Sequence, residues 1–187
     1  IEHLSPDQRR QLGFAFVPEE RLGRGAVPDM SLVDNALLSA SHTGLKRKGW
    51  IRYQGVRQFA RHIIDRYNVK CADEDAQAKS LSGGNLQKFV IGREVLQRPE
   101  VLVVNQPTWG VDASAAASIR QALLDLAAGG AALIVISQDL DELMEISDNF
   151  AALNEGRLSE PRPAQGLTVE EIGLMMGGAH GMEVAHV

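Results

Sequence analysis

The residues best suited to chemistry form the stretch Leu81-Ser82-Gly83-Gly84-Asn85, which precedes apolar residues at helical intervals. Serine is a residue type that begins helices, and Ser82 can cap the first turn. Gly83 and Gly84 carry no side chains that would keep a ligand from the backbone N–H groups at the positive end of a helix. The stretch therefore predicts a helix start that contacts an anion, with a purely structural helix start as the alternative.

Polar side chains also follow two apolar runs further along the chain. Asn105 and Gln106 come directly after the first run, and Asp112 follows in the same loop. Gln138 comes shortly after the second run. The order, spacing and type of these residues, taken with the glycine-rich stretch, are more specific than any one of the motifs.

The elements that must position these residues indicate an α/β fold. Short apolar strands are predicted at 14–17, 101–104 and 132–136, and the strand at 101–104 is expected to be buried on both faces. A helix from Ser114 to about Ala128 connects the second strand to the third. A strand, a helix and a second strand in this order need a crossover connection, so parallel pairing is expected.

Further helices are predicted from their start signals, at Ser5 and Thr168 with capping boxes and at Ser31 and Asp139. The pattern from Ser31 to about Tyr67 is helical, interrupted by a basic loop at 44–49. A hairpin is expected near 150–158, and a loose tail from Gly177 onward.

Composition excludes several classes of protein. The 187 residues carry a formal net charge of -5, so no global field attracts the chain to nucleic acid. The single Cys71 cannot form an internal disulfide. No apolar run approaches the roughly 18 residues of a membrane-spanning helix. The first residue, Ile1, is typical of a chain cut from something longer.

The phosphate-binding loop Gly-x-x-x-x-Gly-Lys-Ser/Thr is absent from this sequence. Gly44 and Gly49 have its glycine spacing, but Trp50 stands where the lysine would be, and no strand precedes the loop. The chain by itself is therefore not expected to build the usual phosphate cradle.

These motifs together resemble the ATP-binding-cassette family, in which a Leu-Ser-Gly-Gly-Gln-like signature precedes a strand ending in Asp-Glu-Pro-Thr, a Gly-Leu-Asp loop and a switch histidine. More narrowly, the chain is similar to the second cassette of the tandem ATP-binding subunits of bacterial sugar and nucleoside importers. That narrower likeness is carried by residues 17–21, by Asn85, by 106–108 and by 137–142. It covers roughly residues 5–160.

The resemblance implies a role for each matching position. Ser82, Gly83, Gly84 and Asn85 match the signature that closes over ATP held by the opposite cassette, and Asp112 matches the loop that crosses to that cassette. Asn105, Gln106 and Gln138 match the Mg²⁺-assisting aspartate, the water-activating glutamate and the switch histidine, and Glu19 matches the glutamine of the loop facing Mg²⁺ and the membrane partner.

The substitutions at these positions predict a degenerate hydrolytic site. An amide has no accessible proton affinity near pH 7, so Gln106 lacks the general-base function, worth roughly 10²–10⁴-fold in rate. Asn105 keeps a carbonyl oxygen but lacks the negative charge that Mg²⁺ favours. Gln138 retains a hydrogen-bond donor for phosphate.

The expected fold class is thus a partial ABC-type P-loop NTPase core, a parallel sheet with flanking helices, joined to a helical signature subdomain. The expected segments are 1–29 (core with altered Q-loop), 30–97 (helical signature subdomain), 98–160 (RecA-like core) and 161–187 (C-terminal helix and tail).

The function implied is energy coupling in an ABC importer for sugars or nucleosides, with ATP and Mg²⁺ at a site shared with a partner cassette. The implied partners are that cassette, transmembrane permease subunits and, indirectly, a periplasmic or lipoprotein solute-binding protein. The implied location is the cytoplasm, peripheral on the inner face of the cell membrane. Two alternatives stay open: a non-catalytic interaction or regulatory module, and a soluble ABC-type ATPase without a membrane partner.

Overall fold

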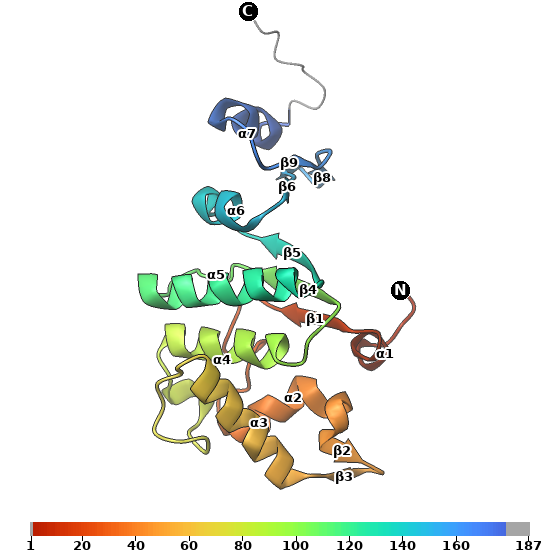
Figure 1. Cartoon of the computed structure of the whole chain (residues 1–187), viewed down its shortest axis with the longest axis vertical. Coiled ribbons are helices and arrows are strands. Elements are labelled where there is room, and N and C mark those ends of the chain that lie inside the picture. Colours follow the sequence, from red (N-terminus) through yellow and green to blue (C-terminus); the bar gives the residue numbers. More distant parts are fainter. Residues whose placement is uncertain (1, 179–187) are drawn as a thin grey trace, which may run out of the picture. The chain divides into compact units, whose positions relative to one another are not determined.

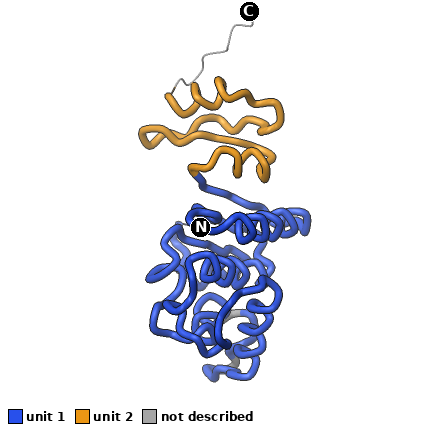
Figure 2. The backbone as a smooth tube through the Cα atoms, turned by 90° about the vertical axis from the view of Figure 1, so that its left-hand side faces the viewer, with its two compact units in different colours: residues 1–137 blue, residues 138–187 orange. Residues whose placement is uncertain are grey.

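The computed structural model describes residues 2–178, so the predicted tail beyond Gly178 lies outside the described residues. The chain divides into two compact units, residues 1–137 and 138–187 (Figure 2). The four segments expected from the sequence stay a prediction.

The first unit contains a three-stranded parallel sheet in the order β1-β4-β5. The strands are β1 (Phe14–Val17), β4 (Val101–Asn105) and β5 (Ala132–Ile136). In the register, Val17 lies opposite Val104 and Asn105 lies opposite Ile136. Helix α5 (Ala113–Ala128) connects β4 to β5, which confirms the predicted crossover and the parallel pairing.

The prediction that the strand at 101–104 is buried on both faces holds for one face of β4, because Val101 and Val103 on the other face are only partly buried. Leu102 and Val104 of β4 are fully buried, whereas Ile134 and Ile136 of β5 are about half exposed, at 54% and 49%. The reason is topological: among the described strands β5 pairs only with β4, so it forms an edge of this sheet and covers no further strand.

Four helices complete the main body of the first unit: α1 (Pro6–Gln11), α2 (Leu32–Ala40), α3 (Tyr53–Arg66) and α4 (Gly83–Val95). Helix α4 is central, because it contacts β1 and α5 on one side and α2 and α3 on the other (Figure 1). Its apolar residues Phe89, Val90 and Ile91 are completely buried. The glycine-rich stretch is therefore the start of a helix held firmly on both sides.

The basic loop predicted at 44–49 is in fact a small hairpin. After an irregular turn at Ser41–Leu45, β2 (Lys46–Arg47) pairs antiparallel with β3 (Trp50–Ile51). Lys48 and Gly49 between them have φ of 50° and 84°, the left-handed pair that a two-residue type I′ turn requires. The hairpin could not be detected in the sequence, because each of its strands has only two residues and shows no alternation of polar and apolar side chains.

Gly92 is required by the packing of α4 against the end of α3. A Cβ at this position would lie 2.4 Å from Cδ2 of Tyr67, far inside contact distance. We expect Gly92→Ala to lower the free energy of unfolding by about 1–3 kcal/mol through overpacking, measured by urea denaturation. Gly173→Ala is the matched control, since a Cβ there meets nothing within 4 Å, and it is expected to be neutral or stabilising. Equal effects of the two substitutions would contradict this account.

The second unit consists of two short helices and two small antiparallel ribbons: α6 (Leu140–Ile146), β6 (Asn149–Phe150), β7 (Leu153–Asn154), β8 (Arg157–Leu158), β9 (Arg162–Pro163) and α7 (Val169–Met176). The predicted hairpin is confirmed as β7 with β8, and the predicted capping box of α7 is formed between Thr168 and Glu171. Among the helices of the described residues, none is long and apolar enough to cross a bilayer.

Candidate functional site

The start of α4 is organised around the Ser82 hydroxyl. Ser82 occupies the N-cap position, but its side chain does not bond to the helix backbone as predicted. The Asn85 side-chain amide instead donates to Ser82 Oγ at 2.8 Å, and Asn85 Oδ1 accepts from the Lys70 N–H at 2.9 Å. The Ser82 hydroxyl therefore accepts a hydrogen bond from the Asn85 side chain and not from the backbone of the first turn. The N–H groups of Gly83 and Gly84 thus belong to the first-turn donors that a helix cannot pair internally.

Arg21 lies against this helix start. The sequence placed it within residues 17–21, which carry the family likeness, but predicted no role for it at the site. A Cβ on Gly83 would be 2.9 Å from Arg21 Nη1, and a Cβ on Gly110 would be 3.6 Å from Nη2. No hydrogen bond or ion pair engages the Arg21 guanidinium among the described residues. Burial lowers the pKa of Arg21, yet a guanidinium stays protonated in proteins. An unpaired cation therefore lies beside the two signature glycines.

Asp112 approaches the same glycines from the loop after β4. Its Oδ1 accepts the Ala115 N–H at 2.9 Å, which caps α5, and this bond is the main cause of the lowered pKa of Asp112. Its Oδ2 would be 3.5 Å from a Cβ on Gly84. Asp112 is thus an ionised cap next to the signature, and its crossing to another cassette stays a prediction.

A buried side chain joins the signature helix to that loop. The Gln87 amide is completely buried and donates from Nε2 to the Pro107 carbonyl at 2.8 Å. Pro107 follows Gln106 directly, so this bond ties α4 to the segment that carries the predicted catalytic position. The sequence signal was available, since Gln87 is polar at an inward position of the α4 pattern.

Asn105 and Gln106 lie at the carboxyl end of β4, and Glu19 follows the neighbouring end of β1. Gln106 is buried, has φ of 51° and donates its N–H to the Ile136 carbonyl at 2.7 Å. Glu19 is exposed. Gln138 is the first residue of the second unit and is also exposed. In the part of the chain that the structure describes, no cluster of His, Cys, Asp and Glu side chains has the composition of a metal site.

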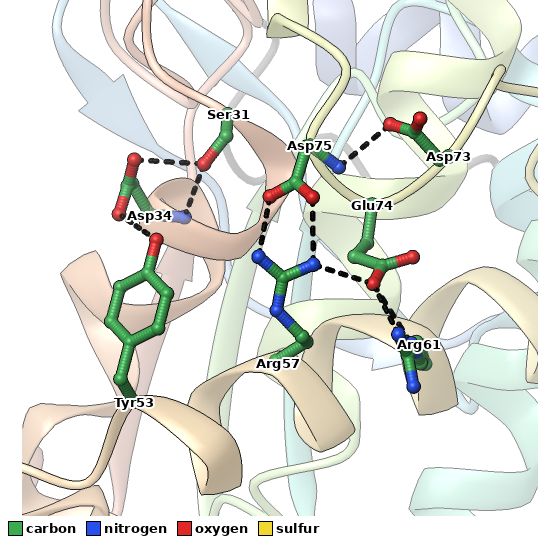
Figure 3. A network of polar contacts seen from close by, with 8 residues as sticks. All are labelled: Ser31, Asp34, Tyr53, Arg57, Arg61, Asp73, Glu74 and Asp75. Atoms are coloured by element: carbon green, nitrogen blue, oxygen red, sulfur yellow. Dashed lines mark hydrogen bonds and ion pairs between the residues drawn. The ribbon is translucent and has the colours of Figure 1, made fainter.

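The segment that leads into the signature is fastened to α3 by an ionic network (Figure 3). Arg57 donates to Glu74 and to both carboxylate oxygens of Asp75, at 2.7–2.8 Å. Arg61 donates to Glu74 as well, at 2.6 Å from Nη2. The Val33 N–H also donates to the Glu74 carbonyl, so the approach to Ser82 is tied to α2 and to α3.

This network makes the stability of the chain sensitive to acid. The pKa of Glu74 is lowered to about 2 from its ordinary 4.5, first by the hydrogen bond from the Arg61 guanidinium, then by the Glu74 backbone N–H and by the Arg57 guanidinium. The contribution of Glu74 is therefore fully present above pH 4.5 and is lost as the pH falls toward 2. We expect Glu74→Gln to be less stable than the wild type at pH 7, with a gap that closes on acidification. Thermal unfolding across this range measures the gap, and a constant gap would contradict the assignment.

The sequence of the chain is similar to those of known ATP-binding proteins of importers. The guanosine import ATP-binding protein NupO of Bacillus subtilis is 34% identical over 185 residues, covering 96% of this chain and 35% of its own length. The glucose import ATP-binding protein TsgD13 of Haloferax volcanii is 37% identical over 181 residues, covering 95% of this chain and 33% of its own length. The chain thus spans about a third of the curated relatives it matches. No protein-family model matches it.

Solved structures agree on the fold. A dimeric ATP-binding cassette bound to ADP and Pi superimposes with a TM-score of 0.71 at 20% identity, covering 88% of this chain and 70% of that one. An ATP-binding subunit of an ABC transporter gives a TM-score of 0.71 at 17% identity, covering 92% and 71%.

The chain therefore has the fold of part of an ATP-binding cassette, which confirms the fold class expected from the sequence. Within that class it is a homologue of the import ATP-binding proteins for nucleosides and sugars, which confirms the resemblance.

Proposed function

We propose that this chain contributes the signature surface to ATP held by a partner cassette, in an importer for sugars or nucleosides. The names of the relatives support the solute classes. The observation that carries the proposal is the start of α4, where Ser82, Gly83 and Gly84 are held in place by Asn85 and flanked by the unpaired Arg21.

The residues at this helix start suit the terminal phosphate of a nucleotide. The two glycines leave the backbone N–H groups approachable, and the aligned peptide dipoles of a 13-residue helix favour an anion at that end. The Ser82 hydroxyl can donate its proton, since its oxygen already accepts from Asn85. Arg21 adds a positive charge that no carboxylate of the described residues neutralises.

The chain's own hydrolytic position is proposed to be inactive. Gln106 cannot accept a proton at neutral pH, and Asn105 offers one neutral oxygen where Mg²⁺ favours a carboxylate. These residues do not fit a resident magnesium ion. In the proposed complex, Mg²⁺ accompanies the nucleotide of the partner cassette, and this chain supplies contacts to phosphate only.

The proposed setting follows from the relatives. The chain would correspond to the second cassette of a tandem subunit that acts at the cytoplasmic face of the membrane. The partner cassette would hold the nucleotide, and permease subunits would receive the closing motion through the helical subdomain of α2 to α4. A solute-binding protein would deliver the substrate on the other side.

ATP hydrolysis measured with separated components tests the proposal. We expect background turnover for the chain alone, and increased turnover when the chain is added to the intact cassette of the same transporter. Turnover by the chain alone would contradict an inactive hydrolytic position. If the chain does not increase the turnover of the intact cassette, the signature role is contradicted. The result would then favour a regulatory module, which the amides at 105 and 106 would also suit.

A further inference from the structure

The β2–β3 hairpin projects from the connection between α2 and α3, at the end of the first unit that is remote from the sheet (Figure 1). Its base is fixed, because the Arg52 N–H donates to the Leu45 carbonyl at 2.8 Å and Thr43 Oγ1 donates to the Ala40 carbonyl at 2.7 Å. Lys46 lies opposite Ile51 in the register. The hairpin is therefore a defined projection and not a loose loop.

The charge of this region is opposite to that of the whole chain. No Asp or Glu occurs between Asp34 and Asp65, although the chain has a net charge of -5. Further along α3, the guanidinium groups of Arg57 and Arg61 are engaged by the carboxylates of Glu74 and Asp75. On the hairpin, Lys46, Lys48 and Arg52 are exposed, and no carboxylate of the described residues pairs with them. The positive charge is thus available to an external partner.

Apolar side chains are exposed among these cations. Trp50 is 82% exposed and Ile51 51% exposed, while the turn between the strands is only Lys48 and Gly49. Trp50 is the most exposed of the large hydrophobic side chains that the structure describes. The hairpin gains no burial within the unit that would account for an indole and an isoleucine at these positions.

We propose that the β2–β3 hairpin docks on an anionic bilayer surface, with the indole of Trp50 at the headgroup level and Lys46, Lys48 and Arg52 against the lipid phosphates. Tryptophan favours the interface between membrane and water, and clustered basic residues are attracted to anionic lipids. An acidic protein surface would satisfy the cations but would not require a protruding tryptophan. This inference is independent of the proposed ATP chemistry.

Fluorescence of the full chain with vesicles tests the docking. The chain has two tryptophans, so Trp109→Phe leaves Trp50 as the sole reporter and Trp50→Phe leaves Trp109 as the internal control. We expect the emission of Trp50 to shift to the blue on addition of phosphatidylcholine vesicles containing phosphatidylglycerol, and not on addition of pure phosphatidylcholine. The emission of Trp109 is expected to stay unchanged.

Co-sedimentation gives the magnitude. Each basic residue near an anionic surface is worth about a fivefold change in partitioning, so Lys46→Gln with Lys48→Gln should lower partitioning roughly 30-fold. Lys70→Gln with Lys79→Gln removes the same charge away from the hairpin and should have little effect, with circular dichroism confirming the fold of both variants. No preference for phosphatidylglycerol, or equal losses in the two double variants, would overturn the proposal. Binding only to the permease would overturn it in favour of a protein partner.

Discussion

Replacing Ser82 with aspartate is expected to lower the ATP turnover of the assembled transporter by at least about 100-fold, the loss typical for removal of a donor to a developing charge. Aspartate is as good an N-cap as serine, and its carboxylate can accept from Asn85 as the hydroxyl does, so α4 should still form. The new negative charge would face the phosphate of the partner cassette. The measurement is ATP hydrolysis in proteoliposomes with the solute present.

Ser82→Asn is the matched control, because asparagine is also a good N-cap, is similar in size to aspartate and carries no charge. Its turnover should fall much less than that of Ser82→Asp. Equal losses in the two variants would show that shape and not charge matters at this position. Full turnover with aspartate would contradict the signature role altogether.

Glu94→Ala is expected to lower the free energy of unfolding by about 3–5 kcal/mol, a large part of the 5–15 kcal/mol typical of a domain. Glu94 is completely buried and accepts from Arg93 Nε at 2.9 Å and from Arg10 Nη1 at 3.0 Å. Arg93, 4% exposed, also donates to the Asn35 and Gly25 carbonyls. Removing the carboxylate would leave the buried guanidinium uncompensated.

Urea denaturation of the chain measures this loss. Asp29→Ala is the control, because the Asp29–Lys79 pair is exposed and such pairs are worth no more than about 1 kcal/mol. Glu94→Gln keeps the shape and one acceptor and should fall between the two, which provides a reading if Glu94→Ala does not fold. Similar losses for Glu94→Ala and Asp29→Ala would contradict the buried network.

Much of the fold was predictable because its signals are local. The capping boxes at Ser5 and Thr168 formed as expected, since the two residues of such a box are three positions apart. The strands at 14–17 and 132–136 begin and end where the apolar runs do. The signature stretch could also be found, because its residue types and its place before a helix are contiguous in the chain.

The sequence by itself therefore determined the main helices and strands, the family and the positions where amides replace the expected acidic residues, but not the β2–β3 hairpin. The tertiary structure decided which residues surround the signature: Arg21 reaches Gly83 from a distant loop, and Asn85 takes the Ser82 hydroxyl that was expected to cap the helix. It also decided that Glu94 is completely buried. The physical reason is that caps and periodicity depend on neighbours within one or two turns, whereas burial and charge pairing depend on segments that meet only when the core packs.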